Sequence, residues 1–513
     1  MAFYPQPTMQ QRYYSRLLIF PFLILAVLLM GQTNDPFEME DLISLPEKEF
    51  IIVSLNSADR PTQLALRYFN GDGDLEAERI IDLVKQGLSA QYEGAFFWSG
   101  KLNLVTSLYY PGPKRNHLIF RQFSLPRLDQ VFSDVIDEAY TPEVYRIPFG
   151  YSISPDSSHL MFYGWTYTLP EDPAKVNFRV FDQGMNEVWS QKYTLPYLNE
   201  SLYIYRGAVN DMGRAFIFCE NYDGAPGRDI DERKVEHIIL AADGKPEEVI
   251  RYVLNLPDMT IIGLQAQLMP DNSIVGAAFM NKGRRSRHEG LYTFQIPPDG
   301  TELHRYRILI DDETYQAAYP YGERESIFNA NRHRFQDYFI DKIYPEKDGS
   351  WTILAEQRIE RSNFSEIEFN DLLFLQLPNN LQRVKRIFRI VKRQVGWQGD
   401  WTIYSYKAMR HAGRTFVLFN DNPGNYTGQN TNRTIQAYNG GGTKVMMYSV
   451  DQNGAIQPFD LSPLARSRGV RAIWPSRCQE NGNRGVLLYG EQIGTNGATG
   501  LLFGFPWSDL LQD

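Results

Sequence analysis

Short runs of alternating apolar and polar residues recur along the chain in pairs, each pair joined by turn-forming residues. The first hairpin of a unit is clearest around Asp156 (YSISPDSSHLMFY), Asp211 (AVNDMGRAFIFC) and Asp271 (QLMPDNSIVGAAF). The second hairpin follows a few tens of residues later, as in NFRVFDQGMNEVWSQKYTL and MMYSVDQNGAIQPFDL. Alternation with a period of two residues is typical of half-buried strands. The pattern therefore predicts repeating units of four strands.

Units of four strands favour one all-β fold, a single β-propeller of four-stranded antiparallel blades, over a sandwich, whose strands do not repeat in fours. We assign residues 37–513 to it. Eight blades, which we favour, follow if the two end units are separate, and seven follow if they merge. The final unit is one strand short, and propellers commonly close their ring by pairing an N-terminal strand into the last blade. Segments 74–87 and 382–393 also have helical spacing, but their alignment with the other units favours strands.

One hairpin carries a family resemblance. The residues from Ser154 to Phe162 (SPDSSHLMF) resemble the turn of TolB-type and other WD40-like propeller repeats. The Trp-Asp and Gly-His pairs of true WD40 blades are missing. The resemblance therefore implies a propeller without implying a specific family.

Composition agrees with this fold, because 31 Tyr, 31 Phe, 39 Gly and 29 Pro favour strands and turns. The net charge of −9 argues against a nucleic-acid partner, since phosphate binding requires a basic surface. The two cysteines, Cys219 and Cys478, fall in units on nearly opposite sides of an eight-bladed ring. We therefore predict no disulfide and expect Cys219 to be a buried apolar residue.

The N-terminal residues predict export. Arg12 and Arg16 precede an apolar run from Leu17 to Met30, and a polar stretch follows. The run is shorter than a spanning helix and contains Pro21, so we predict a signal peptide at residues 1–31 rather than a retained anchor. The expected location is periplasmic or extracellular. The alternative is a protein anchored in the membrane through residues 17–31.

Long connections are expected on one face only. In a propeller the connections between the first and second strands and between the third and fourth strands share a face, and here they are short. The other two kinds of connection are long, and long loops on a rigid scaffold commonly bind ligands. Aromatic and carboxylate side chains there suit sugar or peptide binding, although packing between blades is the more common role of such aromatics. The candidate binding residues are Tyr315, Tyr319, Tyr321, Trp397, Asp400, Trp401 and Tyr426.

Signals of metal binding and catalysis are sparse. Asp223, Asp229 and Asp231 share one loop and could hold Ca²⁺, although a solvated acidic loop needs no ion, and no other cofactor is expected. NGDGD at residues 70–74 lacks the later ligands of a calcium loop and predicts a hairpin turn. No HExxH or G-x-S-x-G motif occurs. The basic run from Arg383 to Arg393 could contact a polyanion, but a solvated outer strand is the simpler interpretation.

Three hypotheses for function remain open. The favoured one is a non-enzymatic binding module that recognises a protein, peptide or glycan of the cell envelope through its long-loop face. The second is a propeller hydrolase or lyase that acts on glycans with carboxylates around the axis. The third is a structural subunit of an envelope assembly. Three or more convergent acidic, histidine or arginine side chains at the axial mouth would favour the second.

Overall fold

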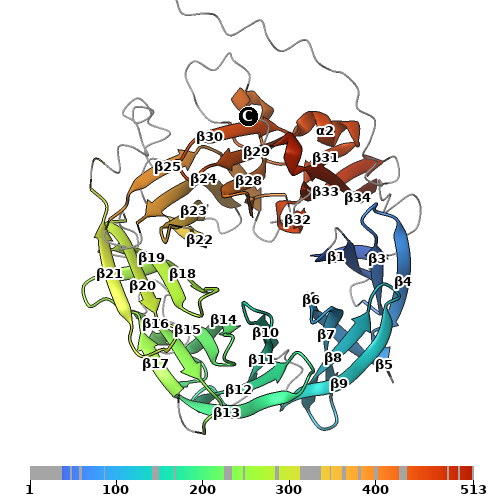
Figure 1. Ribbon diagram of the computed structural model, residues 1–513, viewed down its shortest axis with the longest axis vertical. Coiled ribbons are helices and arrows are strands. Elements are labelled where there is room, and N and C mark those ends of the chain that lie inside the picture. Colours follow the sequence, from blue (N-terminus) through green and yellow to red (C-terminus); the bar gives the residue numbers. More distant parts are fainter. Residues whose placement is uncertain are drawn as a thin grey trace, which may run out of the picture.

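The chain folds as a ring of eight antiparallel sheets about a common axis, as the computed structural model in Figure 1 shows. No described helix is long and apolar enough to cross a membrane. The described residues are 37–46, 49–56, 61–85, 87–140, 149–166, 169–223, 234–246, 249–282, 288–311, 313, 337–346, 348–360, 366–378, 383–397, 403–426, 436–481, 485–494 and 497–510.

The first four blades follow one another in chain order. Blade 1 consists of β1 (Phe37–Ser44), β2 (Phe50–Asn56), β3 (Gln63–Phe69) and β4 (Leu75–Asp82). Blade 2 consists of β5 (Val84–Lys85), β6 (Leu88–Trp98), β7 (Lys101–Tyr110), β8 (Arg115–Ser124) and β9 (Asp129–Tyr140). Blade 3 consists of β10 (Phe149–Ile153), β11 (His159–Thr166), β12 (Pro173–Asp182) and β13 (Glu187–Leu198). Blade 4 consists of β14 (Leu202–Val209), β15 (Ala215–Asp223), β16 (Lys234–Ala242) and β17 (Val249–Val253).

The remaining four blades complete the ring. Blade 5 consists of β18 (Thr260–Leu268), β19 (Ile274–Asn281), β20 (Gly290–Ile296) and β21 (His304–Leu309). Blade 6 consists of β22 (Tyr338–Pro345), β23 (Trp351–Glu360), β24 (Glu366–Leu377), β25 (Arg386–Ile390) and β26 (Gln394–Trp397). Blade 7 consists of β27 (Lys407–His411), β28 (Arg414–Asp421), β29 (Lys444–Val450) and β30 (Ile456–Asp460). Blade 8 consists of β31 (Val470–Ile473), β32 (Gln479–Asn481), β33 (Gly485–Gly494) and β34 (Gly497–Pro506). The short helices are η5 (Pro423–Tyr426), α2 (Ser462–Ser467), η6 (Pro475–Arg477) and η7 (Trp507–Asp509).

Three blades depart from a simple four-strand order. Blade 2 has a fifth strand, because the two-residue β5 pairs with the inner edge of β6. In blade 6 the outer strand is interrupted, because β25 pairs with residues 372–376 of β24 and β26 pairs with residues 366–369 of the same edge. In blade 8 the inner strand is interrupted, because β31 and β32 pair in line with one edge of β33 while β34 covers the other edge. Blade 8 thus has four strands but is three strands wide. This confirms the prediction that the final unit is one strand short.

Burial explains why the sequence forms these strands. The second strand of blade 5, β19, is buried along its whole length, because neighbouring blades cover both of its faces. It is accordingly a continuous run of apolar and small residues. The outer strand β4 instead alternates between exposed and half-buried residues, as expected of an edge next to solvent. The helical interpretations of segments 74–87 and 382–393 are therefore wrong, since both contain strands.

The hydrophobic core lies between the blades. Eight clusters of buried side chains among the described residues each join two successive blades, and together they run once around the ring. The cluster that closes the ring packs Met39, Phe50 and Phe69 of blade 1 against Leu487 and Tyr489 of blade 8. The strand β1 pairs with β2 of its own blade. Closure between the described blades therefore rests on side-chain contacts. The two end units form separate blades, which confirms the predicted eight blades over the seven-blade alternative.

The turns between first and second strands form an interlocked belt on one face. In the SPD turn, Asp156 accepts hydrogen bonds from the Ser154 hydroxyl and the Ser158 amide, both at 2.8 Å. Its own amide donates to Asp211 of the next blade at 2.9 Å, and the Asp211 amide donates to Asn272 of the following blade at 2.8 Å. These turns are therefore occupied by contacts within the ring. The second strands β15 and β28 run away from these turns and end at the opposite face, and the long connections expected at 224–233 and 427–435 lie outside the described residues.

Candidate functional site

Most of the predicted binding residues lie outside the described residues. These are Tyr315, Tyr319, Tyr321, Asp400 and Trp401, and the candidate calcium ligands Asp229 and Asp231. Asp223 is the last residue of β15. Trp397, which we expected in a loop, ends the strand β26. These placements leave the predicted binding and calcium sites as predictions.

Tyr426 has partners within its own blade. It ends the helix η5, and its hydroxyl donates to Asp421 at 2.6 Å and lies 3.2 Å from the hydroxyl of Tyr448. The ammonium group of Lys444 lies 4.2 Å from the centre of its ring. Burial and the nearby carboxylate of Asp421 raise the pKa of Tyr426. These contacts anchor the chain at the end of β28.

The inner strands of five blades share an irregularity at one level of the ring. Each has a register shift opposite the fourth to sixth residue of the second strand of its blade. The second-strand residues at this level are fully or almost fully buried, whereas those at the shifts are exposed or half-buried. We call this set the bulge ring. Its members are Glu40 (blade 1), Glu93 (blade 2), Tyr205 (blade 4), Gly263 and Leu264 (blade 5) and Asp341 (blade 6).

Bulges change the direction of side chains, and they are frequent at barrel rims and beside active sites. Here Glu40, Glu93 and Asp341 are partly exposed acidic residues of the innermost strands, whereas Tyr205 and Leu264 pack partly on the core between blades 4 and 5. The strand β27 of blade 7 begins at this level, with Lys407 paired to the fifth residue of β28. Tyr406, the residue before it, therefore stands beside the ring. The bulge ring and its neighbours form the candidate functional site.

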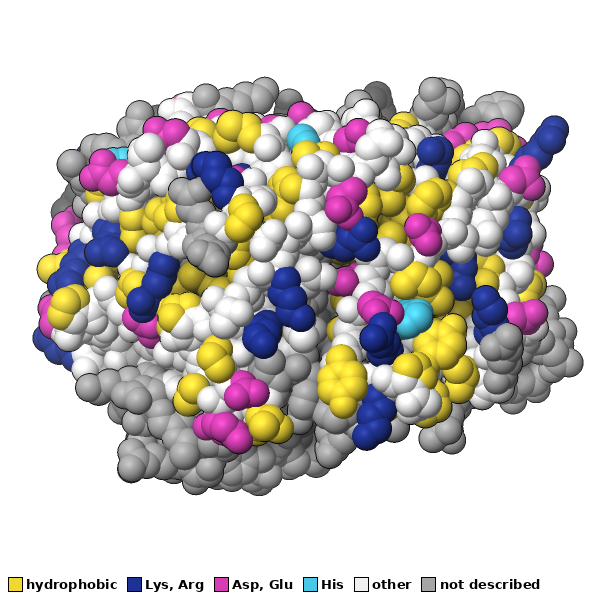
Figure 2. Space-filling model, turned by 90° about the horizontal axis from the view of Figure 1, so that it is seen from below, with side chains coloured by type: hydrophobic (Ala, Val, Ile, Leu, Met, Phe, Trp, Pro, Cys, Tyr) yellow, Lys and Arg dark blue, Asp and Glu magenta, His cyan; other side chains and the backbone are white. Residues whose placement is uncertain are grey.

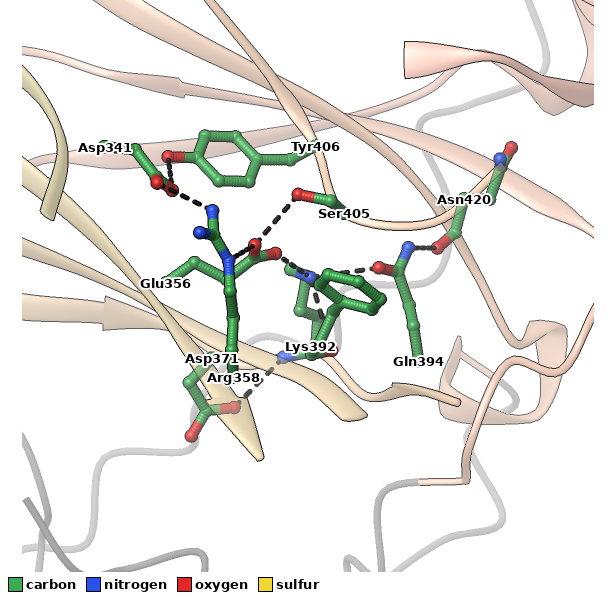
Figure 3. Close-up of polar contacts among 10 residues, drawn as sticks. Asp341, Glu356, Arg358, Asp371, Lys392, Gln394, Ser405, Tyr406 and Asn420 are labelled. Carbon is green, nitrogen blue, oxygen red and sulfur yellow. Dashed lines mark hydrogen bonds and ion pairs between the residues drawn. The ribbon is translucent and has the colours of Figure 1, made fainter. Parts of the chain in front are cut away.

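Polar contacts join the bulge ring to the neighbouring blade where blade 6 meets blade 7 (Figure 3). The carboxylate of Asp341 accepts a hydrogen bond from Arg358 at 2.6 Å and another from the hydroxyl of Tyr406 at 2.8 Å. The side chains of Asp341 and Arg358 are 19% and 28% exposed, so a ligand could reach both. Burial raises the pKa of Asp341 and of Tyr406. The pair thus offers one partly exposed acceptor and one partly exposed donor group.

A fully buried ion pair supports this arrangement from behind. The ammonium group of Lys392 donates to Glu356 at 2.7 Å and to Gln394 at 3.0 Å, and neither charged side chain is exposed. Glu356 also accepts hydrogen bonds from Arg358 at 3.0 Å and from Ser405 at 2.8 Å. Burial lowers the pKa of Lys392, while Glu356 opposes that shift. Arg358 is therefore held between the buried Glu356 and the ring residue Asp341.

The network continues toward blade 8 through neutral amides. Gln394 donates to the backbone carbonyl of Asn420 at 2.7 Å, and the Asn420 side chain donates to the carbonyl of Ile473 in β31 at 2.7 Å. The amide of Ile473 donates back to the Asn420 side chain at 3.1 Å. Blades 6, 7 and 8 are consequently linked by one set of polar contacts. Such a network fixes the relative positions of the strands that carry it.

Half of the basic run between residues 383 and 393 turns inward, while Arg383, Lys385 and Arg386 are exposed. Arg389 is almost buried and pairs with Asp371 at 3.0 Å, and Lys392 pairs with Glu356. Arg393 lies 3.5 Å from Glu368. These three charges are neutralised inside blade 6. The interpretation of the whole run as a solvated outer strand is therefore wrong, and the charge available to a polyanion is smaller than the sequence indicates.

A second acid–tyrosine contact lies where blade 1 meets blade 2. The hydroxyl of Tyr92 in β6 donates to the carboxylate of Asp41, the residue after Glu40 in β1. Burial first, and Asp41 second, raise the pKa of Tyr92, and the same causes raise that of Tyr151 in blade 3 to about 12. Glu93 accepts a hydrogen bond from Ser107 at 2.5 Å. The ring thus has a second, differently built polar segment.

Sequence reasoning missed these residues because no local motif marks them. Asp341 lies on β22, Glu356 on β23 and Lys392 in the connection between β25 and β26, and their contacts arise only when these segments come together in blade 6. A weak signal does exist, because Lys392 belongs to a basic run that also contains several apolar residues, which indicates that part of the run is buried. Both cysteines are free and buried, in blades 4 and 8, as predicted.

Comparison with known proteins shows no family for this chain. No family model and no curated protein matches the chain. The β-propeller domain of the Trilobed protease from Pyrococcus furiosus is 14% identical, with 71% of this chain and 94% of that chain covered and a TM-score of 0.33. The WD40 domain of SCAP from fission yeast is 8% identical, with 93% and 96% covered and a TM-score of 0.42. The polysaccharide lyase Uly1 is 8% identical, with 82% and 89% covered and a TM-score of 0.36. The chain is a β-propeller by its own strand order, and no specific family is shown.

Proposed function

We propose that this chain is an exported, non-enzymatic binding module that recognises a protein, peptide or glycan of the cell envelope. Export rests on the apolar run at residues 17–30 and the basic residues before it. The ligand would approach from the long-loop face and contact the bulge ring. The observation that carries this proposal is the repetition of one inner-strand bulge in five blades, since a bulge changes the direction of a side chain and such bulges are frequent beside active sites.

The chemistry of the ring suits a ligand with both hydrogen-bonding and apolar parts. Glu40, Glu93 and Asp341 provide carboxylates, and Tyr205 provides a half-buried aromatic ring. Arg358 adds a partly exposed donor beside Asp341. A binding site usually combines apolar contact with a few well-placed polar groups. Because acidic and basic groups occur together, the ring does not select a strongly charged polymer.

A screen of the purified chain against a peptide array and an oligosaccharide array tests this proposal. For any ligand found, Tyr205→Ala and Glu93→Gln should each weaken binding at least about tenfold, the loss of one good contact. The matched control is Tyr203→Ala, because Tyr203 lies two residues away on the same strand and is 58% exposed. A ligand whose affinity is unchanged in both ring variants would contradict binding at the ring.

A glycan hydrolase or lyase is the second candidate, and one observation favours it. Asp341 and Arg358 are partly exposed and Glu356 is buried behind them, and such chemistry needs a convergent group of acidic and basic side chains. However, both oxygens of Asp341 and both oxygens of Glu356 already accept hydrogen bonds. Binding is therefore the better supported function. Release of reducing ends or unsaturated sugars from a polysaccharide panel, abolished by Asp341→Asn, would reverse this order.

A further inference from the structure

A second group of exposed side chains lies on blade 2, away from the bulge ring. Register places Tyr110 of β7, Arg115 of β8 and Tyr140 of β9 side by side in one row across three strands. The next row contains His117 opposite Glu138. Residues paired directly across strands project from the same face of the sheet. The five side chains therefore share one face at one end of the blade.

This group is open to solvent. Tyr140 is 50% exposed, and the side chains of Arg115 and Glu138 are 49% and 46% exposed. Below them, Leu108 is buried and Tyr110 packs on the core between blades 1 and 2. Part of the outer wall near β9 shows hydrophobic side chains beside a histidine and mixed charges (Figure 2). The group is thus a rigidly supported surface rather than a loop tip.

The side chains are ordered by contacts with one another. The rings of Tyr110 and His117 lie 4.6 Å apart between their centres. Glu138 pairs with Arg115, and its second oxygen lies 3.3 Å from the Nε2 atom of His117. Two strand spacings separate Tyr110 from Tyr140, about 10 Å between their strands. An oligosaccharide of a few units could therefore stack on both rings while its hydroxyl groups reach the charged pair between them.

We propose that Tyr110, Tyr140 and the pair of Arg115 and Glu138 form a binding subsite for a neutral oligosaccharide. Flat aromatic rings stack on the apolar faces of sugars, and a paired carboxylate and guanidinium supply acceptors and donors for hydroxyl groups. The two charges are balanced, so the site does not attract a polyanion or a polycation. This subsite is independent of the bulge ring and does not rest on the function proposed for it.

Isothermal titration calorimetry of the full chain with maltohexaose, cellohexaose and chitohexaose tests the subsite. At least one hexasaccharide should bind, and Tyr140→Ala should weaken that binding at least about tenfold, as should Glu138→Gln. Val131→Ala is the matched control, because Val131 lies on the same strand and is 53% exposed. Its variant should bind as the parent does.

Thermal unfolding of each variant separates loss of binding from loss of fold. Tyr140 ends its strand and is half exposed, so its variant should melt with the parent protein. Failure of all three hexasaccharides to bind would overturn the subsite, and so would binding that survives both variants. Binding of an extended peptide that these variants weaken, without sugar binding, would assign the surface to a protein partner and overturn the proposal.

Discussion

Two junctions between blades place an inner-strand aspartate against a tyrosine of the next blade, yet they are built differently. Between blades 1 and 2, Asp41 accepts a hydrogen bond from Tyr92. Between blades 6 and 7, Asp341 accepts one from Tyr406 and also pairs with Arg358. Among the described residues, no ion pair joins Asp41 to a basic side chain. The same acid–tyrosine contact is therefore a single hydrogen bond between blades 1 and 2, but part of a network of ion pairs between blades 6 and 7.

The two junctions differ in how strongly each charged side chain depends on its partner for stability. Removal of a charged group from water is costly unless its partners are well placed, and loss of one partner leaves the other unpaired. At the junction of blades 6 and 7, Lys392 and Glu356 are fully buried, so each needs the other. At the junction of blades 1 and 2, Asp41 is half-buried and can regain water. We expect the junction of blades 6 and 7 to be rigid and sensitive to substitution, and the junction of blades 1 and 2 to be tolerant.

The largest expected effect is loss of the buried ion pair. Glu356→Gln leaves Lys392 charged and unpaired in the interior, and should lower the free energy of unfolding by about 3–5 kcal/mol. Urea denaturation monitored by tryptophan fluorescence measures this loss. In the control Glu138→Gln, which removes an exposed partner of Arg115, the loss should be at most about 1 kcal/mol. A loss that small for Glu356→Gln would contradict the proposed interdependence, and the double variant Glu356→Gln with Lys392→Met should recover part of the stability.

The junction of blades 5 and 6 gives an uncharged reference for this comparison. His288 is buried, lies 2.6 Å from the Asn281 side chain through Nδ1, and accepts the amide of Tyr338 at Nε2. Burial lowers its pKa from 6.5 to about 3. Between these values the unfolded chain binds more protons than the folded chain, so the contribution of His288 to stability is present above pH 6.5 and is lost as pH falls. Acidification from pH 7 to pH 5 should cost about 2 kcal/mol through this residue.

Comparison with His288→Gln isolates that residue from the other titrating groups. Free energies of unfolding at pH 7, 6 and 5 should fall less steeply in the variant than in the parent protein. Equal slopes would show that the folded protein accommodates the protonated imidazole. In that case the polar contacts between blades 5 and 6 would be more hydrated than the burial of His288 indicates.

Removal of the phenol at the first junction tests its tolerance directly. Tyr92→Phe removes the hydroxyl donor to Asp41 and should cost about 1–2 kcal/mol, the usual effect of leaving a half-buried acceptor without its partner. Thermal and urea unfolding measure the change. A cost above that of Glu356→Gln would reverse the comparison between the two junctions.

The smallest effect is expected from the equivalent substitution at the second junction. Tyr406→Phe leaves Asp341 paired with Arg358, so the cost should be about 1 kcal/mol or less. The same unfolding experiments measure it beside Tyr92→Phe. If Tyr406→Phe costs more than Tyr92→Phe, then the phenol rather than Arg358 holds Asp341 in place.

Much of the fold could be predicted from the sequence because it depends on local patterns. The turn around Asp156 and the alternating segments after it predict strands and hairpins, and their repetition predicts a ring of blades. Closure could not be predicted, because it depends on whether Met39 and Phe50 pack against Leu487 or whether a strand pairs across the gap. Both outcomes use the same residues. The candidate binding residues in loops, such as Tyr315, carried no pattern that fixes their position.

The sequence by itself determined the class of the protein, the strand units, the separation of the two cysteines and the short turns on one face. Periodic burial causes all of these, and it is visible in the order of the residues. Tertiary structure alone decided which inner strands bulge and which charges meet. Glu356 and Lys392 lie far apart in the chain, and their pairing follows from strand register and from exclusion of water between the blades. These effects belong to the assembled ring and to no single segment of it.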